Sequence, residues 1–188
     1  MKGTYLFLAD GFELSEALTT LDVLKRGGVE VETVSIKDDF FVTSSNGVTI
    51  LSDLVFEELE EDNEPAGAQD MLIFPGGMPG SVNLAEHEDL MKLMKRHYEQ
   101  GGMLAAICAA PSVVLGHLPV AGRKMTCYTG FEQNLQDKGA IYTGTGVEID
   151  GQFITGKGAG LALEFGLAIV NHLKGEEAVE RAKAGMML

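Results

Sequence analysis

The sequence contains no tryptophan, only two cysteines, and half as many basic as acidic side chains, 14 against 28. Cys108 and Cys127 are too few for the disulfide framework of a small secreted protein or for a four-cysteine zinc site. The formal net charge of -14 argues against a nucleic-acid partner and against an anionic membrane surface, because both bind basic surfaces. We therefore expect neither of these partners.

Long hydrophobic runs are also missing at the amino terminus. The apolar run over residues 5–9 ends at Asp10, which is too short for a signal peptide or a membrane span. With 188 residues, of which 45% are hydrophobic and 22% charged, the composition is that of an ordinary soluble globular protein. We expect a single domain over residues 1–188 and a cytoplasmic location.

Short apolar segments alternate with amphipathic ones along the chain. Strands are predicted at residues 4–9, 29–36 and 71–74, with short strands at 40–42, 48–51 and near 125, and a hairpin that turns at Asp150-Gly151. Helices are predicted at residues 13–26, 88–100, 110–117, 131–136, 160–173 and 175–184. This alternation predicts an α/β fold, a doubly wound and mostly parallel sheet with helices on both faces.

The predicted first helix has a leucine stripe and a glutamate outside that stripe. The sequence indicates a capping box, with Asp10 as N-cap and Glu13 reaching back from the third position. Four leucines between residues 14 and 24 form the expected core stripe, whereas Glu16 shares another face with Thr20 and Val23. A glutamate at such a position is usually solvated. The alternative is a site residue, because Glu16 closely follows the carboxyl end of the first strand.

Cys108 stands between an apolar run and a stretch of small residues, within residues 101–111. A glycine pair, an apolar run and then Cys108 predict a strand, a tight turn and a helix, with the sulfur on the turn. The turn lies at the carboxyl edge of the sheet, where open α/β sheets bind ligands. The helix amino terminus is expected to favour the thiolate. The alternative is a small cysteine buried in the core.

A glycine-rich turn, Pro-Gly-Gly-Met-Pro-Gly, occupies residues 75–80 after a predicted strand. Its free backbone N–H groups suit an oxyanion, although an ordinary strand-to-helix turn has the same composition. The six acids between Glu57 and Glu64 are expected to form a solvated surface rather than a calcium loop. The four histidines are expected to be structural or exposed, and two of them, His97 and His172, are assigned to helix surfaces.

Together these motifs resemble those of the ThiJ/PfpI superfamily, which has a class I glutamine amidotransferase-like fold. The matching segments occur in order along the whole chain, at residues 9–16 (ADGFELSE), 74–77 (FPGG), 106–111 (AICAAP), 158–160 (GAG) and 164–165 (EF). The similarity is greatest to the branch of the parkinsonism-associated deglycase and its bacterial ThiJ-type relatives. It implies a flavodoxin-like sandwich, a homodimer, and no metal or organic cofactor. The face of the first helix that carries Val23 is compatible with such a dimer.

The resemblance also assigns the site. Cys108 matches the nucleophile of a strand-to-helix elbow, Glu16 the acid that hydrogen-bonds it, and the N–H groups of Gly77 and Ala109 the oxyanion-binding pair. Two positions depart from the pattern: Ala109 follows the cysteine where relatives similar to intracellular peptidase have histidine, and Tyr128 occupies the pocket position where the parkinsonism branch has histidine. Both departures weaken a peptidase or amidase mechanism, because no base is visible to activate the thiol or to protonate a leaving amine.

We therefore expect a cofactor-independent, thiol-dependent enzyme (a hydro-lyase or hydrolase of glyoxalase or deglycase type) that acts on small carbonyls such as methylglyoxal in stress protection. Isomerisation needs one proton shuttle and no base for a leaving group, so the missing histidine matters less. The alternative is a redox-sensing stress protein or chaperone in which Cys108 oxidises to sulfinate, or in which Cys127 traps a sulfenate as a disulfide.

Overall fold

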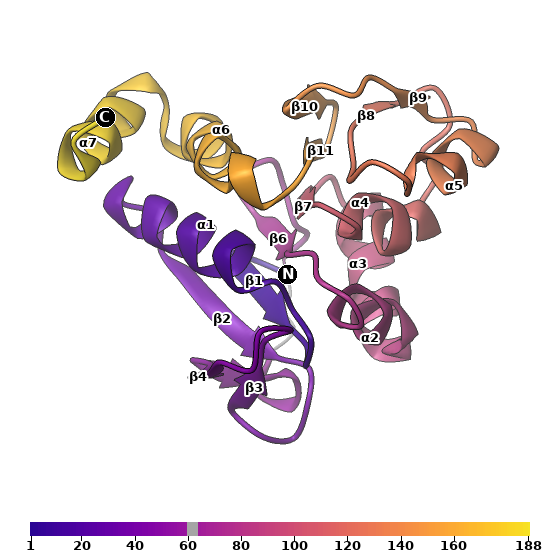
Figure 1. The fold of residues 1–188 in the computed structure, drawn as a ribbon, viewed down its shortest axis with the longest axis horizontal. Coiled ribbons are helices and arrows are strands. Elements are labelled where there is room, and N and C mark those ends of the chain that lie inside the picture. Colours follow the sequence, from indigo (N-terminus) through magenta and orange to yellow (C-terminus); the bar gives the residue numbers. More distant parts are fainter. Residues whose placement is uncertain (60–63) are drawn as a thin grey trace.

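The computed structural model describes residues 1–59 and 64–188, so part of the acidic run between Glu57 and Glu64 lies outside the described residues. A seven-stranded sheet runs through the centre in the order β10-β11-β7-β6-β1-β2-β5 (Figure 1). All neighbouring strands are parallel except β10 and β11, which form the predicted antiparallel hairpin. The strands of this sheet are β1 (Thr4–Leu8), β2 (Val31–Ser35), β5 (Leu54–Val55), β6 (Met71–Phe74), β7 (Met103–Ile107), β10 (Val147–Asp150) and β11 (Phe153–Gly156).

Two short pairs of strands stand outside the main sheet. The hairpin of β3 (Phe41–Thr43) and β4 (Thr49–Leu51) is antiparallel, with Phe41 opposite Leu51. Strands β8 (Lys124–Met125) and β9 (Ile141–Tyr142) are parallel to each other.

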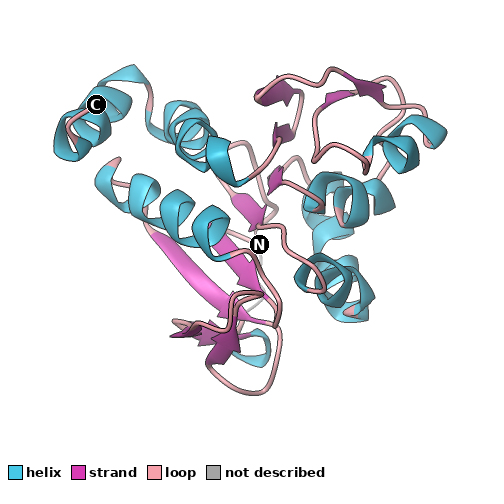
Figure 2. Cartoon of the chain, viewed as in Figure 1, coloured by secondary structure: helices cyan, strands magenta, loops and turns pink. Residues whose placement is uncertain are grey.

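Helices cover both faces of the sheet (Figure 2), which confirms the predicted α/β fold. They are α1 (Leu14–Arg26), α2 (Gly80–Glu86), α3 (Glu88–Glu99), α4 (Ala110–Val113), α5 (Glu132–Asp137), α6 (Ala162–Lys174) and α7 (Glu176–Met186), with 3-10 turns at Phe56–Glu58, Leu115–His117 and Ala159–Leu161. Helices α1, α6 and α7 pack on one face, and α2, α3 and α4 on the other. No helix in the described parts of the chain has the length and apolar character needed to cross a membrane.

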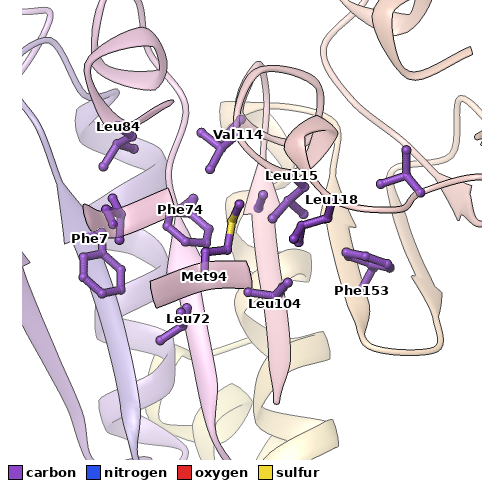
Figure 3. Packing of buried hydrophobic residues seen from close by; sticks show 14 of the residues in the cluster. Phe7, Leu72, Phe74, Leu84, Met94, Leu104, Val114, Leu115, Leu118 and Phe153 are labelled. Carbon is purple, nitrogen blue, oxygen red and sulfur yellow. The ribbon is translucent and has the colours of Figure 1, made fainter. Parts of the chain in front are cut away.

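Successive side chains along each strand point to opposite faces of the sheet, and this divides the core into two layers. Leu104 and Ala106 of β7 point into the layer shown in Figure 3, whereas Ala105 and Ile107 point into the opposite layer. In the first layer Phe7 and Phe74 stack with their ring centroids 5.6 Å apart. Both rings are fully buried, and each stabilises the fold by roughly 2–3 kcal/mol through the apolar surface it removes from water.

The amino terminus of α1 differs from the predicted capping box. Glu13 is the N-cap, and its carboxylate accepts the Glu16 N–H at 2.7 Å. Asp10 does not cap the helix, because the β3–β4 hairpin approaches it. Its carboxylate instead accepts the Thr43 N–H at 2.8 Å and the Lys37 ammonium at 2.9 Å. These bonds anchor the hairpin on the loop that leads into α1.

The buried face of α1 is also different from the leucine stripe. Glu16, Thr20 and Val23 are buried, whereas the leucines at 14, 18 and 21 are only half-buried. Helix α6 packs along this face, and Gly166 makes the close approach possible, since a Cβ there would lie 2.9 Å from the Cβ of Val23. Val23 is fully buried inside the chain, so its predicted availability to a dimer partner is wrong.

His97 is buried, contrary to the predicted helix surface, and only 1% of its surface is exposed. Its Nε2 lies 3.1 Å from the carbonyl oxygen of Met103. The ring fills the space beside Gly102, where any Cβ would collide with it. The helical period predicted a surface position for His97, but the chain that enters β7 covers this end of α3.

Candidate functional site

Cys108 lies between the end of β7 and the start of α4. Its φ of 65° is left-handed, a conformation that is strained for a residue with a side chain and is found at functional sites. Neighbouring segments hold this backbone on both sides: the Cys108 N–H donates to the Gly156 carbonyl at 2.9 Å, and the Tyr128 N–H donates to the Cys108 carbonyl at 2.7 Å. The thiol is half-buried at the carboxyl edge of the sheet.

The Glu16 carboxyl is buried beside this thiol, with 1% of the residue exposed. Its Oε2 accepts the Gly76 N–H at 2.8 Å, and the carboxyl lies close enough to the Cys108 thiol for each group to influence the pKa of the other. The structure therefore brings together the thiol and the acid that the sequence assigned to one site. It does so because the buried face of α1 is turned toward the ends of β6 and β7.

Gly76 is a member of the site that the sequence analysis did not single out. A Cβ on Gly76 would lie 2.6 Å from Glu16 Oε2, 2.5 Å from Cys108 Cβ and 3.0 Å from Cys108 Sγ. The residue thus occupies the narrow space between the acid and the thiol, where only glycine fits. The signal was present in the Pro-Gly-Gly turn, which we interpreted only as an oxyanion site.

The N–H groups of Gly77 and Ala109 both lie close enough to the Cys108 sulfur to lower the pKa of its thiol. Gly77 has a φ of 91° and packs so tightly against the loop at residues 11–13 that a Cβ would overlap its backbone. Ala109 follows the cysteine directly and is the N-cap of α4. The two predicted oxyanion donors therefore converge on one atom.

Burial dominates the electrostatics of the pair. It raises the pKa of Glu16 to about 7, assisted by the charge of Glu13 and opposed by the hydrogen bonds to Cys108 and Gly76. Burial and the nearby Glu16 carboxylate raise the pKa of Cys108 to about 12, against the lowering effect of the Gly77 and Ala109 N–H groups. The N–H at the start of α4 thus acts in the expected direction, toward the thiolate, but burial and the Glu16 carboxylate outweigh it. Helix α4 has only four residues, too few for a substantial dipole.

Tyr128 and Cys127 are neighbours on the segment that is hydrogen-bonded to the Cys108 backbone, but their side chains have different environments. Tyr128 is 51% exposed, and its ring packs edge-on against Phe131 with centroids 6.3 Å apart. Cys127 is fully buried in the core layer of Figure 3, whereas Cys108 contacts the opposite layer. Burial also raises the pKa of Cys127 to about 12. A Cys108–Cys127 disulfide would require these side chains to leave separate layers.

The groups that set the charge state of Cys108 are Glu16 and the N–H groups of Gly77 and Ala109, and no histidine is among them. The histidines act elsewhere: His87 accepts the Leu90 N–H at the start of α3, and His172 lies 2.8 Å from the Ala68 carbonyl oxygen. Over residues 1–59 and 64–188, no three His, Cys, Asp or Glu side chains are grouped to hold a metal ion.

A thiol, a buried carboxyl and two convergent N–H donors form a compact chemical set. The thiol can add to an electrophilic carbon, the carboxyl can accept and return the proton, and the N–H groups can stabilise the negative charge that develops. The set has no strong base for the cleavage of an amide.

Comparison with known proteins gives consistent results over the whole chain. The model of the DJ-1/PfpI family matches residues 2–172. The Caenorhabditis elegans protein named glutathione-independent glyoxalase DJR-1.2 is 36% identical over 162 residues, 86% of this chain and 83% of that protein. The crystal structure of Drosophila melanogaster DJ-1beta matches with a TM-score of 0.88 and 31% identity, covering 100% of this chain and 99% of the other.

Some relatives are longer than this chain. Arabidopsis thaliana DJ-1 homolog B is 34% identical over 181 residues, which make up 95% of this chain but only 40% of that protein. The chain thus spans less than half the length of that relative.

Proposed function

Because the chain belongs to the DJ-1/PfpI family, we propose that it is a cofactor-independent enzyme of glyoxalase or deglycase type that acts on small reactive carbonyls in stress protection. The observation that carries the proposal is the buried Glu16 carboxyl beside the Cys108 thiol, since a Cβ on Gly76 would lie 2.6 Å from Glu16 Oε2 and 3.0 Å from Cys108 Sγ, with the Gly77 and Ala109 N–H groups next to the sulfur. The glyoxalase name of the nematode relative supports the same reaction class.

With methylglyoxal as substrate, the first step is addition. The Cys108 thiol gives its proton to the Glu16 carboxylate, and the sulfur forms a bond to the aldehyde carbon. The electron pair of the broken C=O π bond moves to the oxygen, which the Gly77 and Ala109 N–H groups stabilise. Glu16 then returns its proton to that oxygen, and the product is a hemithioacetal. Because the pKa of Glu16 is about 7, this carboxyl exchanges protons readily at neutral pH.

The second step is isomerisation, followed by hydrolysis. The Glu16 carboxylate removes the hydrogen of the former aldehyde carbon as a proton and returns it to the adjacent carbon, through an enediol. The hydroxyl proton on the first carbon's oxygen moves to the oxygen of the second carbon, so the first oxygen becomes the carbonyl of a thioester. The first carbon is oxidised and the second is reduced, so no external oxidant is needed. Water then cleaves the resulting thioester, which releases lactate and restores the thiol. No step requires a histidine.

The test is lactate formation from methylglyoxal by the wild type, Cys108→Ser and Glu16→Gln. Cys127→Ser is the matched control for the loss of a thiol, because Cys127 is buried away from the site. We expect turnover by the wild type and by Cys127→Ser, and none above background by the other two variants. Equal lactate formation by Cys108→Ser would disprove the mechanism.

The redox alternative predicts another result from the same proteins. If the wild type forms no lactate and mild peroxide adds two oxygen atoms to Cys108, measured by intact mass, then the site is a sensor and the proposed enzyme is excluded.

We also propose that the chain forms a homodimer through the β3–β4 hairpin. One face of this hairpin carries two apolar side chains that remain exposed, in fractions of 56% for Phe41 and 65% for Leu51. Phe41 and Leu51 are directly opposite each other across the two strands. A contiguous exposed apolar face on a short unpaired hairpin is typical of a contact surface.

A further inference from the structure

Three hydrogen bonds between Glu13, Gly76 and Glu16 form a closed ring beside the thiol. The Glu13 N–H donates to the Gly76 carbonyl at 2.9 Å. The Gly76 N–H donates to Glu16 Oε2 at 2.8 Å. The Glu16 N–H donates to Glu13 Oε2 at 2.7 Å, which completes the ring. Each of the three residues donates one bond and accepts one.

From this ring we infer that Glu13 is a positioning residue for the proposed carbonyl reaction, whose carboxylate fixes the Glu16 carboxyl against the Cys108 thiol. The inference rests on the proposed function for its consequence in turnover, but the geometry itself does not depend on the substrate. Two of the three bonds involve Glu13, one through its backbone and one through its side chain. Only the side-chain bond can be removed by substitution.

The hydrogen-bond ring restricts the orientation of the Glu16 carboxyl. Glu16 is in the first turn of α1, and its backbone N–H has no partner within the helix. The Glu13 carboxylate satisfies this N–H and sets the direction in which the helix begins. Without that cap the first turn can fray, and the Glu16 side chain is then held only by the Gly76 N–H and the thiol.

The negative charge of Glu13 also supports the proposed role of Glu16, through the protonation of its carboxyl. The groups that face Glu16 from the surrounding elements are the Cys108 thiol, the Gly76 N–H and the Glu13 carboxylate. The negative charge of Glu13 disfavours a second negative charge on Glu16, and it contributes to the raised pKa of Glu16. A carboxyl that keeps its proton can return it to the new oxygen after the thiol adds.

Glu13→Gln and Glu13→Ala separate these two effects. Glutamine keeps an oxygen that can accept the Glu16 N–H but removes the charge, whereas alanine removes both. Glu30→Gln is the matched control, since it removes one negative charge from an exposed position close to the end of α1. Two properties are measured for each protein: the rate at which iodoacetamide alkylates Cys108 between pH 5 and pH 9, and kcat and KM for methylglyoxal. Thermal unfolding is followed alongside.

Because the pKa of Cys108 is about 12 and its proton passes to the Glu16 carboxylate, the alkylation profile between pH 5 and pH 9 follows the ionisation of Glu16. We expect its midpoint to move to lower pH in Glu13→Gln and to stay unchanged in Glu30→Gln. Glu13→Ala should lose about tenfold or more in kcat with little change in KM, as orientation effects in catalysis predict. Glu13→Gln should recover most of that loss. A Glu13→Ala enzyme with the kcat of the wild type would overturn the inference. If Glu13→Ala does not fold, a folded Glu13→Gln enzyme that is as inactive as Glu16→Gln would overturn it, because glutamine keeps the acceptor of the Glu16 N–H. If the wild type makes no lactate, the proposed function fails, while the alkylation profiles still decide the role of Glu13.

Discussion

The backbone N–H of Tyr128 donates to the carbonyl of Cys108 at 2.7 Å. This bond fixes the position of residue 128 beside the cysteine through backbone atoms alone. The side chain projects outward, is half exposed, and packs against Phe131. A Cβ on Gly158 would lie 3.4 Å from its ring, so a third segment also borders this position. The side chain at 128 can therefore be exchanged without changing the conformation of the site.

Tyr128→His is expected to raise kcat/KM for methylglyoxal. An imidazole changes its protonation state near neutral pH, so a histidine at this position can accept and return a proton during the reaction. The measurement is kcat/KM between pH 5 and pH 9, with Tyr128→Phe as control for loss of the hydroxyl. A histidine variant no faster than the wild type at any pH would show that Glu16 suffices as the proton shuttle.

Gly76→Ala is expected to abolish turnover and to destabilise the fold by roughly 1–3 kcal/mol, as overpacking of a tight site does. The added methyl group collides with both the acid and the thiol. Gly160→Ala is the matched control, because a Cβ at Gly160 meets no atom within 4 Å. Lactate formation and thermal unfolding check both variants. An active Gly76→Ala enzyme would contradict the close contact between Glu16 and Cys108.

Glu16→Gln is expected to inactivate the enzyme and to stabilise it above pH 7. The pKa of Glu16 in the folded state is about 7, above its ordinary 4.5. Between these two pH values the folded protein binds more protons on Glu16 than the unfolded chain does, so stability falls as the pH rises. Replacement by glutamine removes a penalty of up to ~3 kcal/mol. The check is the pH dependence of the unfolding free energy from pH 4 to pH 8, which should be flatter in the variant.

Leu51→Glu is expected to shift the proposed dimer toward monomer. The substitution places a charge opposite Phe41 on the exposed hairpin face, where a partner would have to desolvate it. Ile149→Glu is the control, since Ile149 is 49% exposed on β10, outside the hairpin. Sedimentation equilibrium measures the association constant of each. Identical constants for Leu51→Glu and the wild type would place any dimer interface elsewhere.

The local sequence patterns were sufficient for the longer strands and helices, for the β10–β11 hairpin and for the turn that carries Cys108, but not for β5, β9, α2 or the order of the strands in the sheet. Runs such as residues 71–74 are apolar throughout, which is typical of a strand covered on both faces, and β6 has these bounds. The face of α1 was predicted incorrectly, because a helical period cannot show that Gly166 lets α6 approach Val23.

The proximity of Glu16 and Cys108 came from strand ends and from family resemblance, and the structure places the two together. Their charge states were not predictable in this way. They depend on burial and on the length of α4, which a sequence motif does not report. His97 was misplaced for a similar reason, because only the fold shows that it fills the space beside Gly102.

The hairpin that carries the proposed interface is bonded to the loop that leads into the site. Asp10 accepts bonds from Lys37 and Thr43, and the Ser45 N–H donates to the Phe12 carbonyl at 2.8 Å, one residue before Glu13. Only a few hydrogen-bonded residues thus lie between the proposed dimer contact at the hairpin and the Glu16 carboxyl. We therefore expect specific activity to depend on enzyme concentration, because dilution below the dissociation constant of the proposed dimer removes the contact at the hairpin.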